Sequence, residues 1–250
     1  MDKQEHFNAI LTSDQENREK ISKNIYDEHY DKELDADKIK PQTQRRKNRI
    51  SLYKSIVGQG HERILEIGCG IGDLTYALID NAKRITGVDI SSKVLDFAKT
   101  RRSLYSIGDD QFRKIEFLQM SGVNLDFPSA TFDYVVSTSM IEHLHPEDVE
   151  QHLRDVWRIL KNNGHYLIWC PNRLGHHKDR AGHLCMFSYK DLIGKMKHAG
   201  FRNLQSTLFT RPQMVDARFK IFLEKFLSAL RIKTLWSHLG VRNILLVATK

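Results

Sequence analysis

The chain has 250 residues, and its 40% hydrophobic content with 12 Phe is enough to build the core of one large domain. No apolar run approaches the roughly eighteen residues that span a bilayer. The three cysteines give neither a disulfide framework nor a CxxC metal site. Because the N-terminus is polar and has no signal-peptide core, we expect a cytoplasmic protein.

The formal net charge of +8 is unevenly distributed along the chain. Residues 1–37 carry five basic and eleven acidic residues, whereas residues 38–54 carry seven basic residues and no acidic one. Such a basic segment favours contact with nucleic acid, anionic lipid or an acidic small molecule. A solvated cationic face explains it equally well, so charge alone leaves these alternatives open.

The first 58 residues predict helices. Apolar residues at roughly helical spacing over residues 1–37 predict one or two helices lying over the main domain. Pro41 interrupts the pattern, and residues 43–58 predict a further helix. We therefore expect an N-terminal helical cap over residues 1–58.

From residue 59 onwards, apolar strands alternate with helical patterns. Strands are expected at 63–67, 84–89, 115–119, 132–137 and 164–170, and helices near 73–81, 92–106, 147–161 and 188–199. Strands that alternate with helices of this length are typical of a mostly parallel sheet with helices on both faces.

The end of the chain departs from this alternation. Residues 201–210 and 241–249 predict two strands that pair antiparallel at one edge of the sheet, with a helical insert at 211–240. The sequence therefore predicts a doubly wound α/β fold whose seven-stranded sheet is mostly parallel and has an antiparallel edge strand. The main domain is expected to cover residues 59–250.

The central motif is Glu66-Ile67-Gly68-Cys69-Gly70-Ile71-Gly72, which lies between a predicted strand and a predicted helix. In this context, glycines let the backbone approach a ligand, and the helix N-terminus offers unpaired N–H groups. Asp89 ends the next strand, where an acidic residue accepts hydrogen bonds from ribose hydroxyls. The order GxGxG differs from the GxGxxG of dinucleotide sites, and Glu66 would repel a diphosphate. These features favour S-adenosylmethionine, which has a ribose, an ammonium and a sulfonium but no phosphate.

With these residues the chain resembles the class I S-adenosylmethionine-dependent methyltransferases over roughly residues 45–210. The subgroup that it resembles most is the ubiquinone-biosynthesis O-methyltransferase type, where Glu-His follows the fourth strand and Pro-Asn-Arg follows the fifth. The resemblance implies a Rossmann-like methyltransferase fold, S-adenosylmethionine as methyl donor and S-adenosylhomocysteine as product. The remaining segments that carry it are 132–136, 139–144, 160–164, 171–173, and Gly182-His183 before Phe187-Ser188.

The resemblance also implies which residues bind the cofactor. Asp89 would bind the ribose diol, Ile90 would pack on adenine, and Arg49 loosely matches an arginine that meets the cofactor carboxylate. The family often has Asp-Ala after its third strand for the adenine amino group, but Ser121-Gly122 stands here. That leaves the adenine contact to a hydroxyl or a backbone group. The expected cofactor-binding set is Arg49, Glu66, Gly68, Gly70, Gly72, Asp89, Ile90, Ser121, Gly122, Ser137 and Thr138.

Candidate catalytic residues follow the fourth predicted strand. A hydroxyl acceptor needs a base or a metal to become nucleophilic. Glu142 and His143 lie at the carboxyl end of that strand, where open α/β sheets bind ligands. We predict His143 as general base and Glu142 as its partner or as a metal ligand, and His183 matches a histidine that recurs in the family. The plainer alternative for Glu-His is a helix cap or a structural hydrogen bond.

A metal site is a further alternative. A related small-RNA 2′-O-methyltransferase pattern binds a divalent ion with two glutamates and two histidines. Glu142, His143 and His183 match three of these ligands, but Ser139 replaces the first glutamate. We therefore assign no metal ligand and expect any divalent metal to bind weakly.

The predicted function is methyl transfer to a small-molecule acceptor, at a hydroxyl oxygen. The alternatives are an RNA methyltransferase, favoured by the basic segment 38–54, and a non-catalytic partner subunit that binds the cofactor. Nucleic acid is not the expected partner, because the sequence has no appended RNA-binding module and no aromatic-basic interleaving. The apolar-basic stretch 219–236 predicts either a lid or a peripheral membrane contact. The oligomeric state is not predicted.

Overall fold

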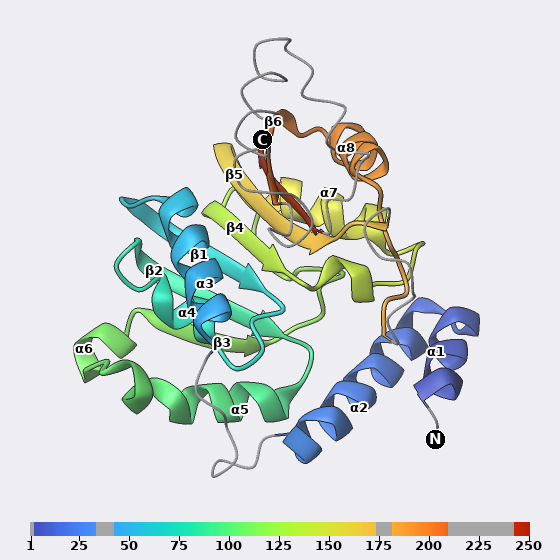
Figure 1. Ribbon diagram of the computed structural model, residues 1–250, viewed down its shortest axis with the longest axis horizontal. Helices are drawn as coiled ribbons and strands as arrows, with labels where there is room; N and C mark the ends of the chain where they lie inside the picture. The colour runs from blue at the N-terminus through green and yellow to red at the C-terminus, as the bar shows by residue number, and fades with distance from the viewer. Residues whose placement is uncertain (1–2, 34–42, 174–181, 210–242) are drawn as a thin grey trace, which may run out of the picture.

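The computed structural model describes residues 3–33, 43–173, 182–209 and 243–250 (Figure 1). Their seven strands form one sheet of order β3-β2-β1-β4-β5-β7-β6, in which β1 to β5 are parallel and β7 is antiparallel to both of its neighbours. The strands are β1 (His61–Ile67), β2 (Ala82–Asp89), β3 (Ile115–Gln119), β4 (Phe132–Thr138), β5 (Leu160–Pro171), β6 (Arg202–Phe209) and β7 (Asn243–Thr249). The predicted doubly wound sheet is confirmed, with the antiparallel pair β6–β7 at one edge.

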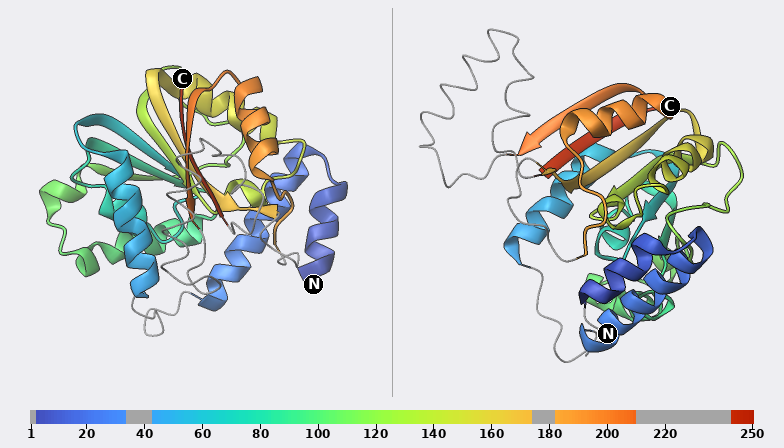
Figure 2. Two further views of the ribbon diagram at one scale, coloured as in Figure 1. Left: turned by 45° about the horizontal axis from the view of Figure 1, so that its top comes forward. Right: turned by 90° about the vertical axis from the view of Figure 1, so that its right-hand side faces the viewer.

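Helices cover both faces of the sheet (Figures 1 and 2). On one face lie α3 (Gln44–Val57), α4 (Asp73–Ala77) and α5 (Ser92–Thr100), and on the other lie α7 (Val149–Ile159) and α8 (Tyr189–His198). The short α6 (Asp109–Phe112) and the 3-10 helices η2 (Arg101–Tyr105) and η3 (Ile141–His143) complete this part of the chain.

The central strands are apolar on both faces because helices bury both faces. Along β1, Ile64 packs into the core beneath α3, α4 and α5, whereas Leu65 and Ile67 pack into the core beneath α7 and α8. Successive side chains of a strand point to opposite faces, so one apolar run contributes to both cores. This explains why the parallel strands appear in the sequence as continuous apolar segments.

The helix expected at 92–106 is divided into α5 and η2. The tighter turn of η2 brings Arg101 and Tyr105 to the same partner, the buried carboxylate of Asp73 at the start of α4. The helices expected near 73–81, 147–161 and 188–199 correspond to α4, α7 and α8, with ends shifted by a few residues.

Two N-terminal helices, α1 (Lys3–Thr12) and α2 (Gln15–Glu33), pack against each other beside the carboxyl ends of the parallel strands (Figures 1 and 2). Arg18 in α2 donates from Nε and Nη2 to Asp148, the N-cap residue of α7, at 3.1 and 2.7 Å. Near the other end of α2, Asp27 accepts a hydrogen bond of 2.5 Å from Ser91, the N-cap residue of α5. Side chains near both ends of α2 therefore attach it to the sheet domain.

Some predictions lie outside the described residues. They are the helical insert 211–240 and its stretch 219–236, expected to be a lid or a membrane contact. Among the described residues, no helix combines the length and hydrophobicity that crossing a membrane requires.

We predict that Asp148→Ala loosens α2, because Arg18 and Asp148 are each 8% exposed and the substitution leaves Nε and Nη2 of a buried guanidinium without the carboxylate that they bind. Removing one member of a buried ion pair costs about 3–5 kcal/mol. Amide hydrogen exchange should accelerate along α2. The control is Glu150→Ala, an exposed position on α7, which should leave exchange in α2 unchanged. Equal protection of α2 in both variants would show that the ion pair does not hold this helix.

Candidate functional site

The glycine-rich loop between β1 and α4 requires glycine at specific positions. Gly68 has φ +71°, and a Cβ there would lie 2.7 Å from Cγ of Met140. Gly72 has φ +78° and forms the N-cap of α4 in the left-handed region. L-residues with side chains rarely adopt these conformations, so the loop can follow this path only with glycine. The backbone thereby lies directly against the residues that follow β4.

Asp89 ends β2 and joins the loop to the next helix. Its Oδ2 accepts a hydrogen bond of 2.9 Å from the Gly70 N–H, and its Oδ1 accepts one of 3.1 Å from the Ser91 N–H. Burial raises the pKa of this carboxyl, and the backbone N–H donors oppose that shift. Each oxygen of an ionised carboxylate has about two acceptor sites, so Asp89 can accept further bonds from a diol.

Two other carboxylates stabilise the loop. Glu66 is 2% exposed and accepts a hydrogen bond from the Thr75 hydroxyl. Burial raises its pKa to about 8, and the charge of Asp73 adds to that effect. Asp73 in turn forms ion pairs of 2.7 Å with Arg46 of α3 and with Arg101 of η2. The end of the loop is therefore fixed from two sides.

Two adjoining cavities lie at the carboxyl ends of the strands. The first, about 340 Å³, lies between α2 and the ends of β1 to β4, and the second, about 730 Å³, lies between α3 and the glycine-rich loop. Both are lined by His29 and Tyr30 from α2, together with Gly68 and Ser139. The two cavities therefore adjoin at these four residues.

The predicted cofactor residues divide between these cavities. The first is lined by Asp89, Ile90, Ser121 and Gly122, the second by Arg49, Glu66, Gly70 and Thr138, and both by Gly68. Gly72 and Ser137 line neither cavity. Nine of the predicted positions thus line one or both of two adjoining cavities.

Arg49 offers a positive charge to the second cavity. Its guanidinium lies 5.0 Å from the ring centroid of Trp169, a cation–π arrangement. Its Nε is buried and has no hydrogen-bond partner among the described residues. Burial lowers the pKa of Arg49, with its neighbours Arg45 and Arg46 adding to the effect. A buried unpaired donor of this kind suits the carboxylate of a ligand.

A buried network supports the Ser121-Gly122 turn. His152 Nδ1 lies 2.6 Å from the Gly122 carbonyl oxygen, which can only accept, so Nδ1 carries the proton. Its Nε2 then accepts from the Tyr166 hydroxyl at 2.9 Å, and that hydroxyl accepts from Ser137 at 2.7 Å. The Ser137 side chain is thus directed into the core, where it positions the turn indirectly.

Glu142, His143 and His183 form a cluster after β4, with one ligand atom of each within 4.8 Å of the others. Leu184 and Cys185 donate their backbone N–H groups to the Glu142 carbonyl oxygen, which holds the segment with His183 against η3. His143 lines the first cavity, whereas Glu142 and His183 are not lining residues. Sequence positions forty residues apart therefore meet beside the cavity.

The hydrogen bonds of the cluster define its chemistry. His143 Nδ1 donates to the Gly182 carbonyl oxygen at 2.6 Å, which leaves Nε2 as the nitrogen with the lone pair. Burial lowers the pKa of His143, so its neutral form is favoured. Glu142 is 1% exposed, burial raises its pKa to about 8, and its Oε2 has no hydrogen-bond partner among the described residues. Such a set can accept a proton or hold a divalent cation.

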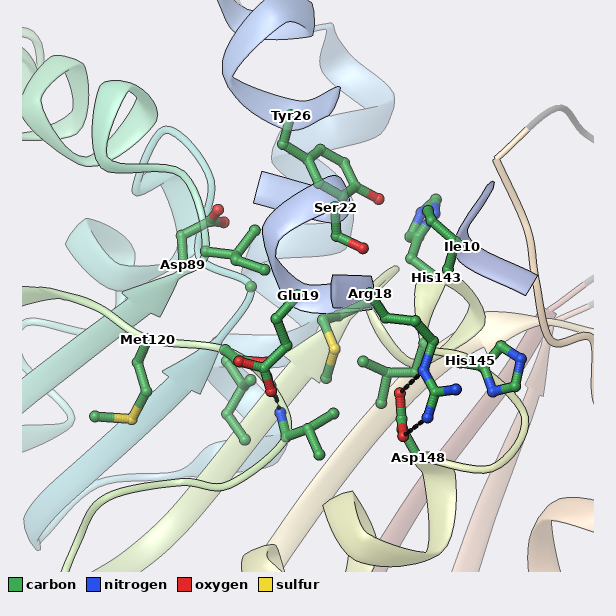
Figure 3. Close-up of a pocket in the computed structure, with 18 of the residues that line it drawn as sticks. Ile10, Arg18, Glu19, Ser22, Tyr26, Asp89, Met120, His143, His145 and Asp148 are labelled. Atoms are coloured by element: carbon green, nitrogen blue, oxygen red, sulfur yellow. Dashed lines mark hydrogen bonds and ion pairs between the residues drawn. The ribbon is translucent and has the colours of Figure 1, made fainter. Parts of the chain in front are cut away.

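Sequence reasoning missed the side chains that α2 contributes. Glu19, Ser22, Tyr26 and Tyr30 all line the first cavity, and Figure 3 shows the first three projecting from α2 between Asp89 and His143. Their spacing of three or four residues places them on one face of the helix. That mixed polar and aromatic face was visible in the sequence, but nothing there indicated what it would cover.

Comparisons with known proteins point to one kind of domain. A protein-family model described as "Methyltransferase domain" matches residues 65–168. A probable S-adenosylmethionine-dependent methyltransferase of Mycolicibacterium smegmatis is 27% identical over 129 residues, covering 52% of this chain and 46% of that protein. A phosphatidylethanolamine N-methyltransferase of Cereibacter sphaeroides is 31% identical over 106 residues, covering 42% of this chain and 49% of that protein. The chain spans about half the length of the curated relatives it matches.

A solved structure supports the fold over nearly the whole chain. It is the Burkholderia thailandensis 1,6-didemethyltoxoflavin-N1-methyltransferase with bound 1,6-didemethyltoxoflavin and S-adenosylhomocysteine. Its TM-score is 0.64 at 16% sequence identity, and the match covers 95% of this chain and 91% of that one. At this identity the likeness shows the Rossmann-like fold.

We predict a loss of stability in mild acid through His152. Its pKa is about 4 in the folded protein because burial disfavours the charged ring, against an ordinary value of 6.5. The contribution of the neutral His152 ring to the free energy of unfolding is complete above pH 6.5 and is lost as the pH falls towards 4. The stability lost over this pH interval is about 3 kcal/mol. The difference in unfolding free energy between the wild type and His152→Gln should narrow over this interval in denaturant titrations.

The matched control for this prediction is His198→Gln, which changes an exposed histidine at the end of α8. Its difference from the wild type should stay nearly constant over the same pH interval. A constant difference for His152→Gln as well would contradict the proposed protonation state of the network.

Proposed function

We infer that this chain, which carries a methyltransferase domain of the class I S-adenosylmethionine-dependent type, transfers a methyl group to a hydroxyl oxygen of a small molecule. The observation that carries this proposal is the tautomer of His143. Its Nδ1 is committed to the Gly182 carbonyl oxygen, so Nε2 is free to accept a proton, and His143 lines the first cavity. A neutral buried imidazole beside a ligand cavity is suited to general-base catalysis.

The residues present fit the cofactor. Asp89 keeps acceptor sites for a ribose diol, and Arg49 has a buried unpaired Nε for a carboxylate. The absence of a side chain at Gly68 keeps backbone exposed where the two cavities adjoin. When bound, S-adenosylmethionine supplies a methyl group already activated on a sulfonium.

The chain's own residues would then align the acceptor and remove its proton. Gly68 and Ser139 line both cavities, so the acceptor oxygen would meet the methyl group beside them. His143 Nε2 would take the hydroxyl proton. Helix α2 lies over the first cavity and would exclude water from the reacting atoms.

Transfer to nitrogen is the second candidate. It is favoured by the names of two similar proteins, which are N-methyltransferases. An amine with a free lone pair requires less help from a base than a hydroxyl does. Oxygen is the first choice here because His143 lines the cavity and its Nε2 is left to accept a proton.

We predict that the purified protein transfers label from methyl-labelled S-adenosylmethionine into extracted small molecules. Mass spectrometry of the product should identify an O-methyl group. Total RNA incubated in parallel should remain unlabelled. Label in RNA would support the RNA methyltransferase instead, and cofactor binding without transfer to any fraction would support a non-catalytic partner subunit. An N-methyl product would replace oxygen with nitrogen as the acceptor.

We predict that His143→Ala slows methyl transfer by about 10²-fold or more while the affinity for the cofactor stays within a few-fold of wild type. The loss should appear in kcat measured with saturating cofactor. His198→Ala, a surface histidine on α8, serves as the control and should react at the wild-type rate. A wild-type rate for His143→Ala would remove this residue from catalysis.

Treatment with a chelator separates the base from the metal alternative for the same cluster. If His143 acts as a base, dialysis against EDTA leaves the rate unchanged. A loss of activity that Mn²⁺ or Zn²⁺ restores would instead identify Glu142, His143 and His183 as metal ligands.

A further inference from the structure

The position after β3 lacks the carboxylate that would meet the adenine amino group. Ser121 and Gly122 stand there, and both line the first cavity with Ile90 and Met120. The Ser121 hydroxyl accepts a hydrogen bond of 3.1 Å from the Val123 N–H. This turn therefore offers a hydroxyl to the cavity but no negative charge.

A carboxylate reaches the same place from another element. Glu19 projects from α2 into the first cavity, as Figure 3 shows, and Ser121 lines the same cavity. Burial raises the pKa of Glu19, the Ser121 side chain opposes that shift, and the nearby charge of Asp148 adds to it. Helix α2 therefore brings an acidic group to the turn whose own sequence has none.

One oxygen of this carboxylate has no partner. Oε1 of Glu19 is buried and makes no hydrogen bond with any described residue. The adjacent Arg18 does not compensate it, because its Nε and Nη2 are directed to Asp148 and its Nη1 to Ser13 and Glu147. Buried polar groups normally have partners, and a buried acceptor left without one is costly. Because Glu19 also lines the first cavity, its carboxylate is suited to accept from a donor on a ligand there.

We propose that Glu19 accepts a hydrogen bond from the exocyclic amino group of the cofactor's adenine, so that helix α2 determines the specificity for the base. The proposal rests on the proposed function, because it presumes that the first cavity holds the adenosine half of the cofactor. Ile90 and Met120 flank the place where the ring would lie, and Asp89 marks the ribose beside it. A carboxylate discriminates against a base without a donor at carbon 6.

The test is a double-mutant cycle between the protein and the ligand. Calorimetry would measure the dissociation constants of S-adenosylhomocysteine and of its analogue that has purine in place of adenine, which lacks only the amino group. The wild type should bind the adenine form about 10- to 100-fold more tightly, as expected for a hydrogen bond to a charged acceptor. Glu19→Ala should bind both ligands with nearly equal affinity.

Two further variants test whether the preference for adenine depends on the position of the carboxylate. Glu16→Ala changes an exposed glutamate on the same helix, which pairs with Lys20, and should keep the wild-type ratio. Adding Ser121→Asp to Glu19→Ala returns a carboxylate to the turn after β3 and should restore part of the preference for adenine. If the role of Glu19 is purely structural, Glu19→Ala would lower the affinity for both ligands equally and leave the ratio of the two dissociation constants unchanged.

The outcomes also distinguish this proposal from the proposed function. If the wild type and Glu19→Ala show the same preference for adenine, Glu19 does not read the base, and the inference is overturned. Cofactor binding would still stand in that case, provided that Asp89→Ala lowers the affinity for both ligands. If the wild type binds neither ligand, the proposed function and this inference are both wrong.

Discussion

The hydrogen bonds that the Asp89 carboxylate accepts hold the parts of the site together. Its two oxygens accept backbone N–H groups from Gly70 and Ser91, so the glycine-rich loop and the start of α5 are held at a fixed separation. Ser91 then caps α5 and donates to Asp27 of α2. One buried acidic group thus links the loop, the second strand, the helix behind it and the covering helix. The burial that raises its pKa also strengthens the bonds it accepts.

The site is assembled from segments that are distant in the sequence. The glycine-rich loop and the ends of β2, β3 and β4 form one wall, and α2 forms the opposite wall of the first cavity. The segment carrying His183 is held against η3 by the backbone of Glu142. Since parallel strands end at the same edge of a sheet, short loops after them converge there, whereas α2 is attached by long-range side-chain contacts.

Much of the fold and part of the site could be predicted from the sequence. Strand positions followed from apolar runs, because a parallel sheet covered on both faces buries nearly every strand residue. Asp89 and the glycines could be placed because their roles depend on local spacing. The role of Ser137 could not, since its hydroxyl turns into the core towards Tyr166. Nor could Glu19, because its position depends on how Arg18 meets Asp148, a contact between residues 130 positions apart.

The attachment of α2 also has a consequence for the order in which the molecule is formed. On the ribosome, α2 emerges before the sheet to which it binds, and Arg18 must wait for Asp148 until a further 130 residues have been synthesised. Contacts of such sequence separation form late, because the entropy of closing the intervening loop must first be offset by other structure. The nascent chain would therefore acquire its scaffold before it acquires a closed cofactor pocket.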